Sequence, residues 1–270
     1  MTRPRAKKSL GQNFLLDPNY QRKIIDALDP QCDDDVIEIG PGTGALTDHL
    51  IGNVRSLTVI ELDNALAAAL QKEYGDRPDF TLIHQDVMTV DFAGVAATKI
   101  VGNIPYNITS PLIFKLLDRS ARPAVLLVMV QKEVADRMVA PAGQSAFGAL
   151  TVGVQSVADV QRLFVVPRGA FRPVPKVDSA VVRIVPRRPA ELSAEEETDL
   201  RALTRAAFSW RRKQLQNVLR NAEGFGLTSE QVAEIEASTG LAMSQRPEQL
   251  APANFIALSR ALRARGYPMS

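Results

Sequence analysis

The sequence contains few of the side chains on which metal binding and covalent catalysis depend. Its 270 residues include one cysteine, Cys32, and two histidines, His49 and His84. A single cysteine cannot form a disulfide within the chain, and these three residues exclude a Cys/His zinc cluster. They also exclude Cys-His and Ser-His nucleophile pairs at any recognisable spacing. We therefore expect no metal site and a reducing, cytoplasmic setting.

Long apolar runs and a strong net charge are also missing. The longest apolar run, Ala124–Val130, has seven residues, whereas a membrane helix needs about 20. The basic first residues lead into a polar stretch rather than an apolar one, which predicts that there is no secretory signal. The net charge of +2 at pH 7 is too small to indicate a polyanionic partner by itself. We expect a soluble protein with no membrane partner.

The basic residues are nevertheless unevenly distributed along the chain. Residues 1–23 contain six basic side chains and one acidic one, and residues 162–188 contain seven basic side chains and one acidic one. Such stretches either contact a polyanion such as RNA or form solvated surfaces. The charge pattern alone leaves both interpretations open.

Short apolar strands alternate with helical stretches over the first half of the chain. A helix with Asp17 as its cap is predicted to run to about Leu28. Strands are predicted at 35–39, 57–60, 80–83, 99–101 and 124–130, with helices at 45–50, 64–74, 111–117 and 132–139 between them. This alternation predicts an α/β fold with a doubly wound parallel sheet. After a possible helix at 147–157, the β-rich runs 160–166 and 179–185 predict an antiparallel pair that completes the sheet.

The remainder of the chain has a helical pattern. Residues 186–189 have the composition of a linker, and Ser193 with Glu196 forms a capping box that opens an all-helical tail. We therefore predict an α/β domain in residues 1–188 and a small helical domain in residues 189–270.

A glycine-rich loop, Gly40-Pro-Gly-Thr-Gly44, connects the strand at 35–39 to the following helix. Glycines have no Cβ, so the backbone of such a loop can approach a ligand closely. Gly40, Gly42 and Ala45 fit the dinucleotide fingerprint, whereas Gly40, Gly42 and Gly44 fit the loop that binds S-adenosylmethionine equally well. Both cofactors remain open at this point.

Two acidic residues follow the next strands. Glu61 ends the second strand, where a carboxylate can accept hydrogen bonds from both hydroxyls of a ribose. Asp86 comes just after the third strand, and its carboxylate could accept a hydrogen bond from an adenine amino group. Each could instead be a solvated acid at a strand end. Three such features in order, one at each strand end, favour a nucleotide site.

The fourth strand runs into Asn103-Ile104-Pro105-Tyr106, the Asn/Asp-x-Pro-aromatic form typical of adenine and amide N-methyltransferases. An exocyclic adenine amine is a poor nucleophile because its lone pair is delocalised into the ring. The side-chain oxygen of Asn103 and the carbonyl of Ile104 can accept its two hydrogens and aim the lone pair at a sulfonium methyl group. Pro105 fixes the turn, and Tyr106 offers a face for the extruded base. The alternative is an ordinary turn. The segment favours S-adenosylmethionine over a nicotinamide cofactor.

With these motifs in order, the chain resembles the ribosomal RNA adenine N6-dimethyltransferases, and among them the bacterial small-subunit members. The similarity lies in residues 8–15, 103–107, 171–179 and 208–219. The resemblance implies a Rossmann-like methyltransferase domain with a small helical C-terminal domain. It also implies that S-adenosylmethionine donates methyl groups to two adjacent adenosines near the 3′ end of 16S rRNA, within an immature 30S particle, and that the enzyme is a cytoplasmic monomer.

The resemblance also assigns roles to individual residues. In cofactor binding, Asn13 and Leu15 belong to a covering segment, Gly40 and Gly42 to the loop, Glu61 to the ribose contact, Asp86 to the adenine contact, and Asn103 to both cofactor and target. In catalysis, it implies Asn103, Ile104, Pro105, Tyr106 and Phe171, with Phe171 and Tyr106 on either side of the target base. Ile104 departs from the usual leucine, but only its backbone carbonyl is invoked.

Two basic groups are candidates for contact with RNA. Phe171 lies on a Pro-rich loop among Arg168, Arg172 and Lys176, where we expect an exposed aromatic for stacking on a base and cations for phosphates. The second group is Arg211, Arg212 and Lys213, beside Phe208 and Trp210. It is either an RNA-contacting face or a solvated face over core aromatics.

Three alternative functions remain open. A relative that methylates large-subunit rRNA and confers antibiotic resistance would share the same chemistry. A ribosome-assembly factor with a mainly non-catalytic role would bind the same particle. A NAD-dependent dehydrogenase would use the glycine loop but has no purpose for residues 103–107.

Overall fold

The computed structural model describes Lys7 and residues 12–92, 95, 97–118 and 122–267. Residues 1–6 of the basic stretch, and residues 8–11 of the first motif, lie outside the described residues. The described chain divides into two compact units, one formed by residues up to 135 with 160–186 and the other by residues 136–159 with those from 187 onward. This division into packed units does not test whether residues 1–188 and 189–270 fold as separate domains. The predicted boundary at 188/189 therefore stays a prediction.

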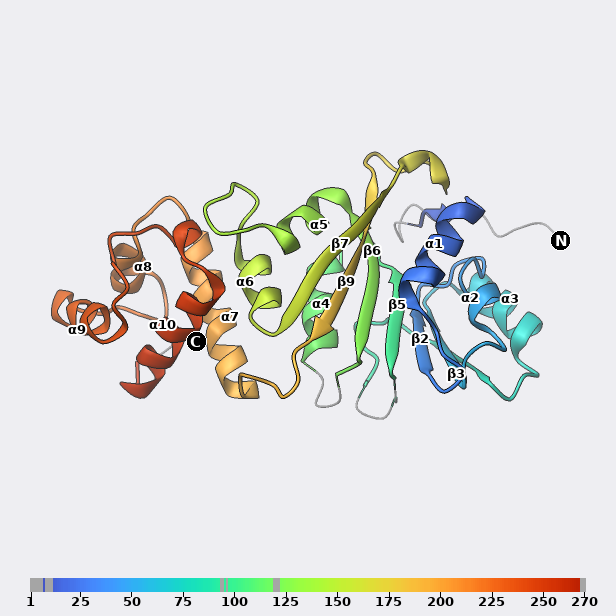
Figure 1. The fold of residues 1–270 in the computed structure, drawn as a ribbon, viewed down its shortest axis with the longest axis horizontal. Coiled ribbons are helices and arrows are strands. Elements are labelled where there is room, and N and C mark those ends of the chain that lie inside the picture. Colours follow the sequence, from blue (N-terminus) through green and yellow to red (C-terminus); the bar gives the residue numbers. More distant parts are fainter. Residues whose placement is uncertain (1–6, 8–11, 93–94, 96, 119–121, 268–270) are drawn as a thin grey trace. The chain divides into compact units, whose positions relative to one another are not determined.

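A sheet of seven strands dominates the first unit in the part of the chain that the structure describes (Figure 1). The order is β4-β3-β2-β5-β6-β9-β7. The pairs from β4 to β6 are parallel, as predicted. Strand β9 is antiparallel to β6, and the two β-rich runs predicted to pair, β7 and β9, are neighbours at the edge of the sheet. The strands are β2 (Asp35–Ile39), β3 (Ser56–Glu61), β4 (Phe80–His84), β5 (Lys99–Asn103), β6 (Val125–Gln131), β7 (Ala158–Val166) and β9 (Ser179–Pro186). The strand order reverses between β2 and β5, which is where such sheets bind ligands.

The first unit adds helices and a two-stranded ribbon to the sheet. The helices are α1 (Pro18–Leu28), α2 (Thr47–Leu50), α3 (Asn64–Tyr74) and α4 (Thr109–Leu117), and α5 (Lys132–Val139) begins in this unit. The ribbon pairs β1 (Phe14–Leu15) with β8 (Phe171–Arg172), which follows a 3₁₀ turn at Arg168–Ala170. Helix α2 begins two residues later than predicted, because the glycine loop still has a left-handed residue at Gly44, with φ of +85°. Helix α4 begins two residues earlier than predicted.

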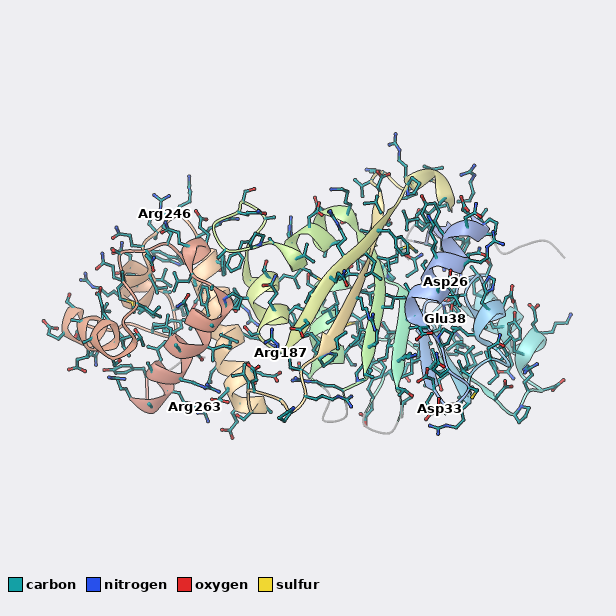
Figure 2. All side chains as sticks on the ribbon, in the orientation of Figure 1. Asp26, Asp33, Glu38, Arg187, Arg246 and Arg263 are labelled. Atoms are coloured by element: carbon teal, nitrogen blue, oxygen red, sulfur yellow. The ribbon has the colours of Figure 1, made fainter. Side chains whose placement is uncertain are left out.

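Apolar side chains cover both faces of the central strand β2. Val36 packs in one cluster with Ile24 and Leu28 of α1, while Ile37 and Ile39, which point the other way, are 0% and 1% exposed. Side chains alternate between faces along a strand, so a strand buried on both faces has a nearly continuous apolar run. Glu38 interrupts this run, and Figure 2 shows it in the strand region.

The second unit is helical and has its own aromatic core. Its helices are α6 (Ala149–Gln155), α7 (Ala194–Ser209), α8 (Leu215–Asn221), α9 (Ser229–Thr239) and α10 (Pro252–Ala264), with a 3₁₀ turn at Pro247–Gln249. The predicted capping box opens α7, with Ser193 Oγ accepting from the Glu196 amide at 3.2 Å. The ring of Phe208 lies 5.9 Å from that of Phe147 and 5.7 Å from that of Phe255. Among the described residues, no helix combines the length and hydropathy needed to cross a membrane.

Candidate cofactor and substrate site

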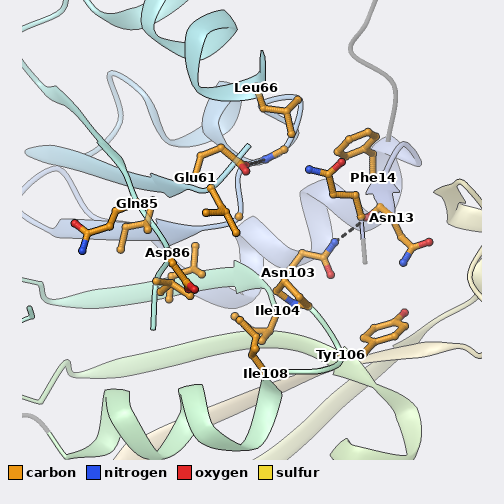
Figure 3. Close-up of a pocket in the computed structure, with 18 residues that line it drawn as sticks. Asn13, Phe14, Glu61, Leu66, Gln85, Asp86, Asn103, Ile104, Tyr106 and Ile108 are labelled. Atoms are coloured by element: carbon orange, nitrogen blue, oxygen red, sulfur yellow. Dashed lines mark hydrogen bonds between the residues drawn. The ribbon is translucent and has the colours of Figure 1, made fainter. Parts of the chain in front are cut away.

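A pocket lies at the carboxyl ends of the parallel strands, on either side of the point where their order reverses (Figure 3). The space between its lining residues is about 760 Å³, which includes open solvent. Most of the predicted cofactor and catalytic residues line it. They are Asn13, Gly40, Gly42, Glu61, Asp86, Asn103, Ile104, Pro105 and Tyr106. Sequence motifs spread over 94 positions of the chain therefore meet at one site.

The glycine loop packs closely against two neighbouring segments. Gly40 and Gly42 have φ values of +66° and +60°, a conformation that other residues adopt only at a cost. A Cβ atom on Gly40 would lie 3.3 Å from the carbonyl oxygen of Asn103, and one on Gly42 would lie 3.0 Å from a ring carbon of Phe14. Both glycines are thus required by the backbone and by close packing.

Glu61 joins the glycine loop to the end of β3. Its Oε1 accepts from the amide of Asp63 at 2.8 Å, and its Oε2 accepts from the amide of Gly42 at 3.3 Å. The side chain is buried, and burial raises the pKa of its carboxyl group, while the backbone hydrogen bonds oppose this shift. The carboxylate has about four lone-pair sites, and backbone amides of Asp63, Gly42 and Leu62 use three of them. Glu61 can therefore accept a ribose hydroxyl as well.

Asp86 lies at the end of the pocket that follows β4. Its Oδ1 accepts from the amide of Met88 at 2.9 Å, which fixes the turn. Apolar residues that the sequence analysis did not single out also line the pocket, namely Phe14, Leu62, Leu66, Val87 and Ile108. Apolar walls with a carboxylate at one end suit a purine with an amino group. Their only signal in the sequence is adjacency to the motifs.

Asn103 ends β5 at the centre of the pocket. Its Nδ2 donates to the main-chain carbonyl of Asn13 at 2.9 Å, as the dashed line in Figure 3 shows. The neighbouring Ile104 has a buried side chain, and its amide donates to the carbonyl of Met129 at 3.1 Å. The amide of Asn103 is thus oriented by its donor end, which leaves its oxygen as the acceptor.

Tyr106 lines the pocket, and Figure 3 shows its ring to the right of Ile104. Its hydroxyl lies 3.1 Å from Oγ of Ser179, a buried residue at the start of β9. This hydrogen bond fixes the phenol end of a half-buried side chain. Strand β9 therefore helps to set the orientation of the ring.

The prediction that Phe171 is exposed was wrong. Its side chain is 1% exposed and packs in the cluster that contains Leu15 and Val181. The physical reason is the ribbon, in which Leu15 of β1 pairs with Phe171 of β8. Leu15 is likewise buried and lines a small neighbouring cavity rather than the main pocket. The stacking role of Phe171 and the cofactor role of Leu15 stay predictions.

The basic residues of the 3₁₀ turn and of the loop that follows β8 are exposed, unlike Phe171 between them. Arg168, Arg172 and Lys176 are exposed, and so are the apolar side chains of Val174 and Val177, at 52% and 41%. Cations beside apolar side chains are a surface that RNA can contact through phosphates and bases. The role of these residues in RNA binding stays a prediction.

The second basic group is divided between two environments. Arg211 pairs with Glu248, its Nε lying 2.6 Å from a carboxylate oxygen, whereas Arg212 and Lys213 are exposed. Of the neighbouring aromatics, Phe208 belongs to the core of the second unit and Trp210 is 37% exposed. Contact between the three basic residues and RNA stays a prediction.

Comparisons with known proteins agree over nearly the whole chain. The family model described as "Ribosomal RNA adenine dimethylase" matches residues 3–263. A protein of Xanthomonas oryzae named "Ribosomal RNA small subunit methyltransferase A" is 45% identical over 257 residues, which is 94% of this chain and 95% of that protein. A protein of the same name from Geobacter metallireducens is 41% identical over 268 residues, covering 97% of both chains.

Solved structures show the same similarity in the fold. A dimethyladenosine transferase from Plasmodium falciparum matches with a TM-score of 0.80 and 26% identity, covering 95% of this chain and all of that one. The 23S rRNA methyltransferase ErmE matches with a TM-score of 0.71 and 25% identity, covering 93% of this chain and all of that one. The predicted fold class, a methyltransferase fold followed by C-terminal helices, is confirmed.

Proposed function

The chain belongs to the ribosomal RNA adenine dimethylase family, and we propose that it dimethylates N6 of two adjacent adenosines near the 3′ end of small-subunit rRNA. Asn103 carries this proposal. Its side-chain oxygen is directed by the bond from Nδ2 to the Asn13 carbonyl, in the pocket that the cofactor motifs line. The names of the relatives from Xanthomonas and Geobacter support the choice of the small subunit.

S-adenosylmethionine, the methyl donor of this family, supplies a methyl group on a sulfonium whose leaving group is a neutral thioether. The residues of the pocket fit this molecule. Glu61 would accept a ribose hydroxyl, and Asp86 would accept the adenine amino group. The backbone of the loop from Gly40 to Gly44 would lie against the remainder. The apolar walls described above would contact the faces of the purine.

The chain's own residues prepare the target amine. Asn103 Oδ1 and the carbonyl of Ile104 accept its two hydrogens, which takes the nitrogen lone pair out of conjugation and aims it at the methyl group. Tyr106, held by Ser179, stacks on the base. No strong base is needed, because the methylated nitrogen is positively charged and releases its proton to solvent. In the second transfer the monomethylated nitrogen has one N–H left, so only one of these two acceptors can bind it.

RNA phosphates would bind to the exposed cations. Arg168, Arg172 and Lys176 form one such group on the first unit, and Arg212 and Lys213 form another on the second. RNA that is folded within a ribosomal particle presents a fixed shape to these two groups. We further propose that the protein acts on an immature 30S particle rather than on free RNA. We also propose that it acts as a cytoplasmic monomer.

A comparison of substrates tests the proposed function. Purified protein is incubated with labelled S-adenosylmethionine and immature 30S particles, 50S particles or deproteinised rRNA, all from a strain without the native methylation. We expect label in the 30S rRNA alone. Transfer to the 50S particle instead would support the large-subunit alternative. Binding to 30S particles without any transfer would support the assembly-factor alternative.

A further inference from the structure

The N-terminal segment touches the centre of the catalytic site through its backbone. Residues 12–17 form this segment and are called the strap below. The main-chain carbonyl of Asn13, in the strap, accepts the hydrogen bond from Asn103 Nδ2 at 2.9 Å. Figure 3 shows Asn13 and Phe14 on the opposite side of the pocket from Ile108. The resemblance assigns this segment a role in covering the cofactor. The contact with Asn103 indicates a second role.

We propose that the main-chain carbonyl of Asn13 is a positioning group for methyl transfer, and that the catalytic amide of Asn103 is correctly oriented only while the strap is closed. This inference rests on the proposed function and deepens it. A carbonyl oxygen can only accept, so it selects the donor end of the Asn103 amide and leaves the oxygen for the target amine. The opposite orientation would place two N–H groups against the N–H groups of the substrate.

The strap is fixed on both sides of this contact. On one side, Asp63 binds Gln12 Nε2 at 3.3 Å and Lys7 Nζ at 2.9 Å, and its own side chain is buried. On the other side, the amides of Leu16 and Asp17 donate to the carbonyl of Ala170 at 2.9 and 3.3 Å. The Asn13 carbonyl lies between these two attachments. A displacement at either one therefore moves it away from Asn103.

The second attachment joins the strap to the segment that carries the predicted base-stacking residue. In the ribbon, Phe14 pairs with Arg172 and Leu15 pairs with Phe171. One hydrogen-bonded segment therefore couples three things: it covers the cofactor, orients Asn103 and places β8. Catalysis would wait until the strap has closed over a bound cofactor, which protects the methyl donor from reaction with water.

Replacing Asn103 by Asp separates the two ends of the amide. Asn103→Asp keeps oxygen acceptors for the target amine but has no donor for the Asn13 carbonyl when it is ionised. We expect kcat at pH 8 to fall at least 100-fold, well beyond any change in the Kd for S-adenosylmethionine. As the pH is lowered, kcat relative to wild type should rise, because a protonated carboxyl regains a donor. A kcat near the wild-type value at pH 8, or a ratio independent of pH, would overturn the proposal.

A backbone substitution tests the attachment to β8. The side chain of Leu16 is 40% exposed, so Leu16→Ala is a mild control that keeps the amide hydrogen. Leu16→Pro removes the donor to Ala170. We expect Leu16→Pro to lower kcat about tenfold and to raise hydrogen exchange of the strap amides at least tenfold, with neither effect in Leu16→Ala. If Leu16→Pro showed faster exchange of the strap amides but the same kcat as Leu16→Ala, the closed strap would not be needed to orient Asn103.

The contact between Asn103 and the strap can also be tested without RNA, by measuring hydrogen exchange of the strap amides. Asn103→Ala deletes the donor to Asn13, so the amides of the strap should exchange faster than in wild type. Unchanged exchange in that variant would overturn the proposed contact even if methylation is observed. If the wild-type protein methylates no particle but the exchange result holds, the proposed function fails and the contact stands.

Discussion

Replacing Glu38 by Gln should stabilise the protein above neutral pH. Glu38 lies on β2 and is 2% exposed, and its Oε2 accepts from the hydroxyl of Thr47 at 2.6 Å. Burial raises the pKa of its carboxyl to about 7, with Asp48 and Glu61 adding repulsion and the Thr47 hydrogen bond opposing both. A glutamine is nearly isosteric and keeps an acceptor for Thr47. It also removes the cost of a buried negative charge.

The magnitude follows from the two pKa values. In the unfolded chain the carboxyl has its ordinary pKa of 4.5, against about 7 in the folded protein. Between these values the unfolded state loses a proton that the folded state keeps. The stability contributed by Glu38 is therefore complete below pH 4.5 and is lost as the pH rises through about 7. At 1.36 kcal/mol per pH unit, the loss is about 3 kcal/mol.

Urea unfolding of the cofactor-free protein at a series of pH values measures this effect. The free energy of unfolding of Glu38→Gln, minus that of wild type, should rise by about 3 kcal/mol between pH 4.5 and pH 8. The exposed Glu73 offers a matched control, since Glu73→Gln should change stability by less than about 0.5 kcal/mol at every pH. A constant difference for Glu38→Gln across this range would show that Glu38 does not keep its proton in the folded protein above pH 4.5.

Three further substitutions test the site and its surroundings. Ser179→Ala removes the hydrogen bond to Tyr106, worth about 1 kcal/mol, so kcat/KM for the particle should fall about fivefold; an unchanged value would deny the ring-holding role. Gly42→Ala places an L-residue at φ +60°, and titration calorimetry should show S-adenosylmethionine binding weakened at least tenfold; unaltered affinity would mean that the loop relaxes. Charge reversal at the exposed Arg168 and Arg172 should weaken RNA binding and lower the slope of log K against log salt by about 2, and equal slopes would place the RNA footprint elsewhere.

The sheet and the centre of the pocket could be predicted because local sequence determines them. A strand that ends in Gly40-Pro-Gly, and another that ends in Asn103-Ile-Pro-Tyr, combine an apolar run with residues whose conformation is restricted. Each motif follows its own strand directly. Since parallel strands share one carboxyl edge, predicting the strands was enough to bring the motifs together.

The ribbon could not be predicted in the same way. Strands β1 and β8 have two residues each and lie more than 150 positions apart in the sequence. Two residues cannot show a periodic pattern, so nothing indicated that Phe171 would be buried. The hydrogen bond from Asn103 to the Asn13 carbonyl was missed for a related reason. Its acceptor is a backbone group that every residue has, so it leaves no signal in the sequence.

Residues 136–159 illustrate a third limit. In the sequence this segment lies between two predicted strands, within the predicted α/β domain, whose boundary at 188/189 stays a prediction. In the structure it packs with the helical tail, where the ring of Phe147 contacts that of Phe208. Long-range side-chain packing of this kind decides which unit a helix joins, and a local pattern carries no record of it.

The most direct test of the central claim is to map methylated nucleosides by mass spectrometry in immature 30S particles treated with wild type or Asn103→Ala. We expect N6,N6-dimethyladenosine at two adjacent positions near the 3′ end of the rRNA with wild type. We expect none with Asn103→Ala, although this variant should still bind S-adenosylmethionine. Dimethylation by Asn103→Ala at the wild-type yield would exclude the proposed role of Asn103, and wild-type methylation at another atom or position would exclude the proposed substrate.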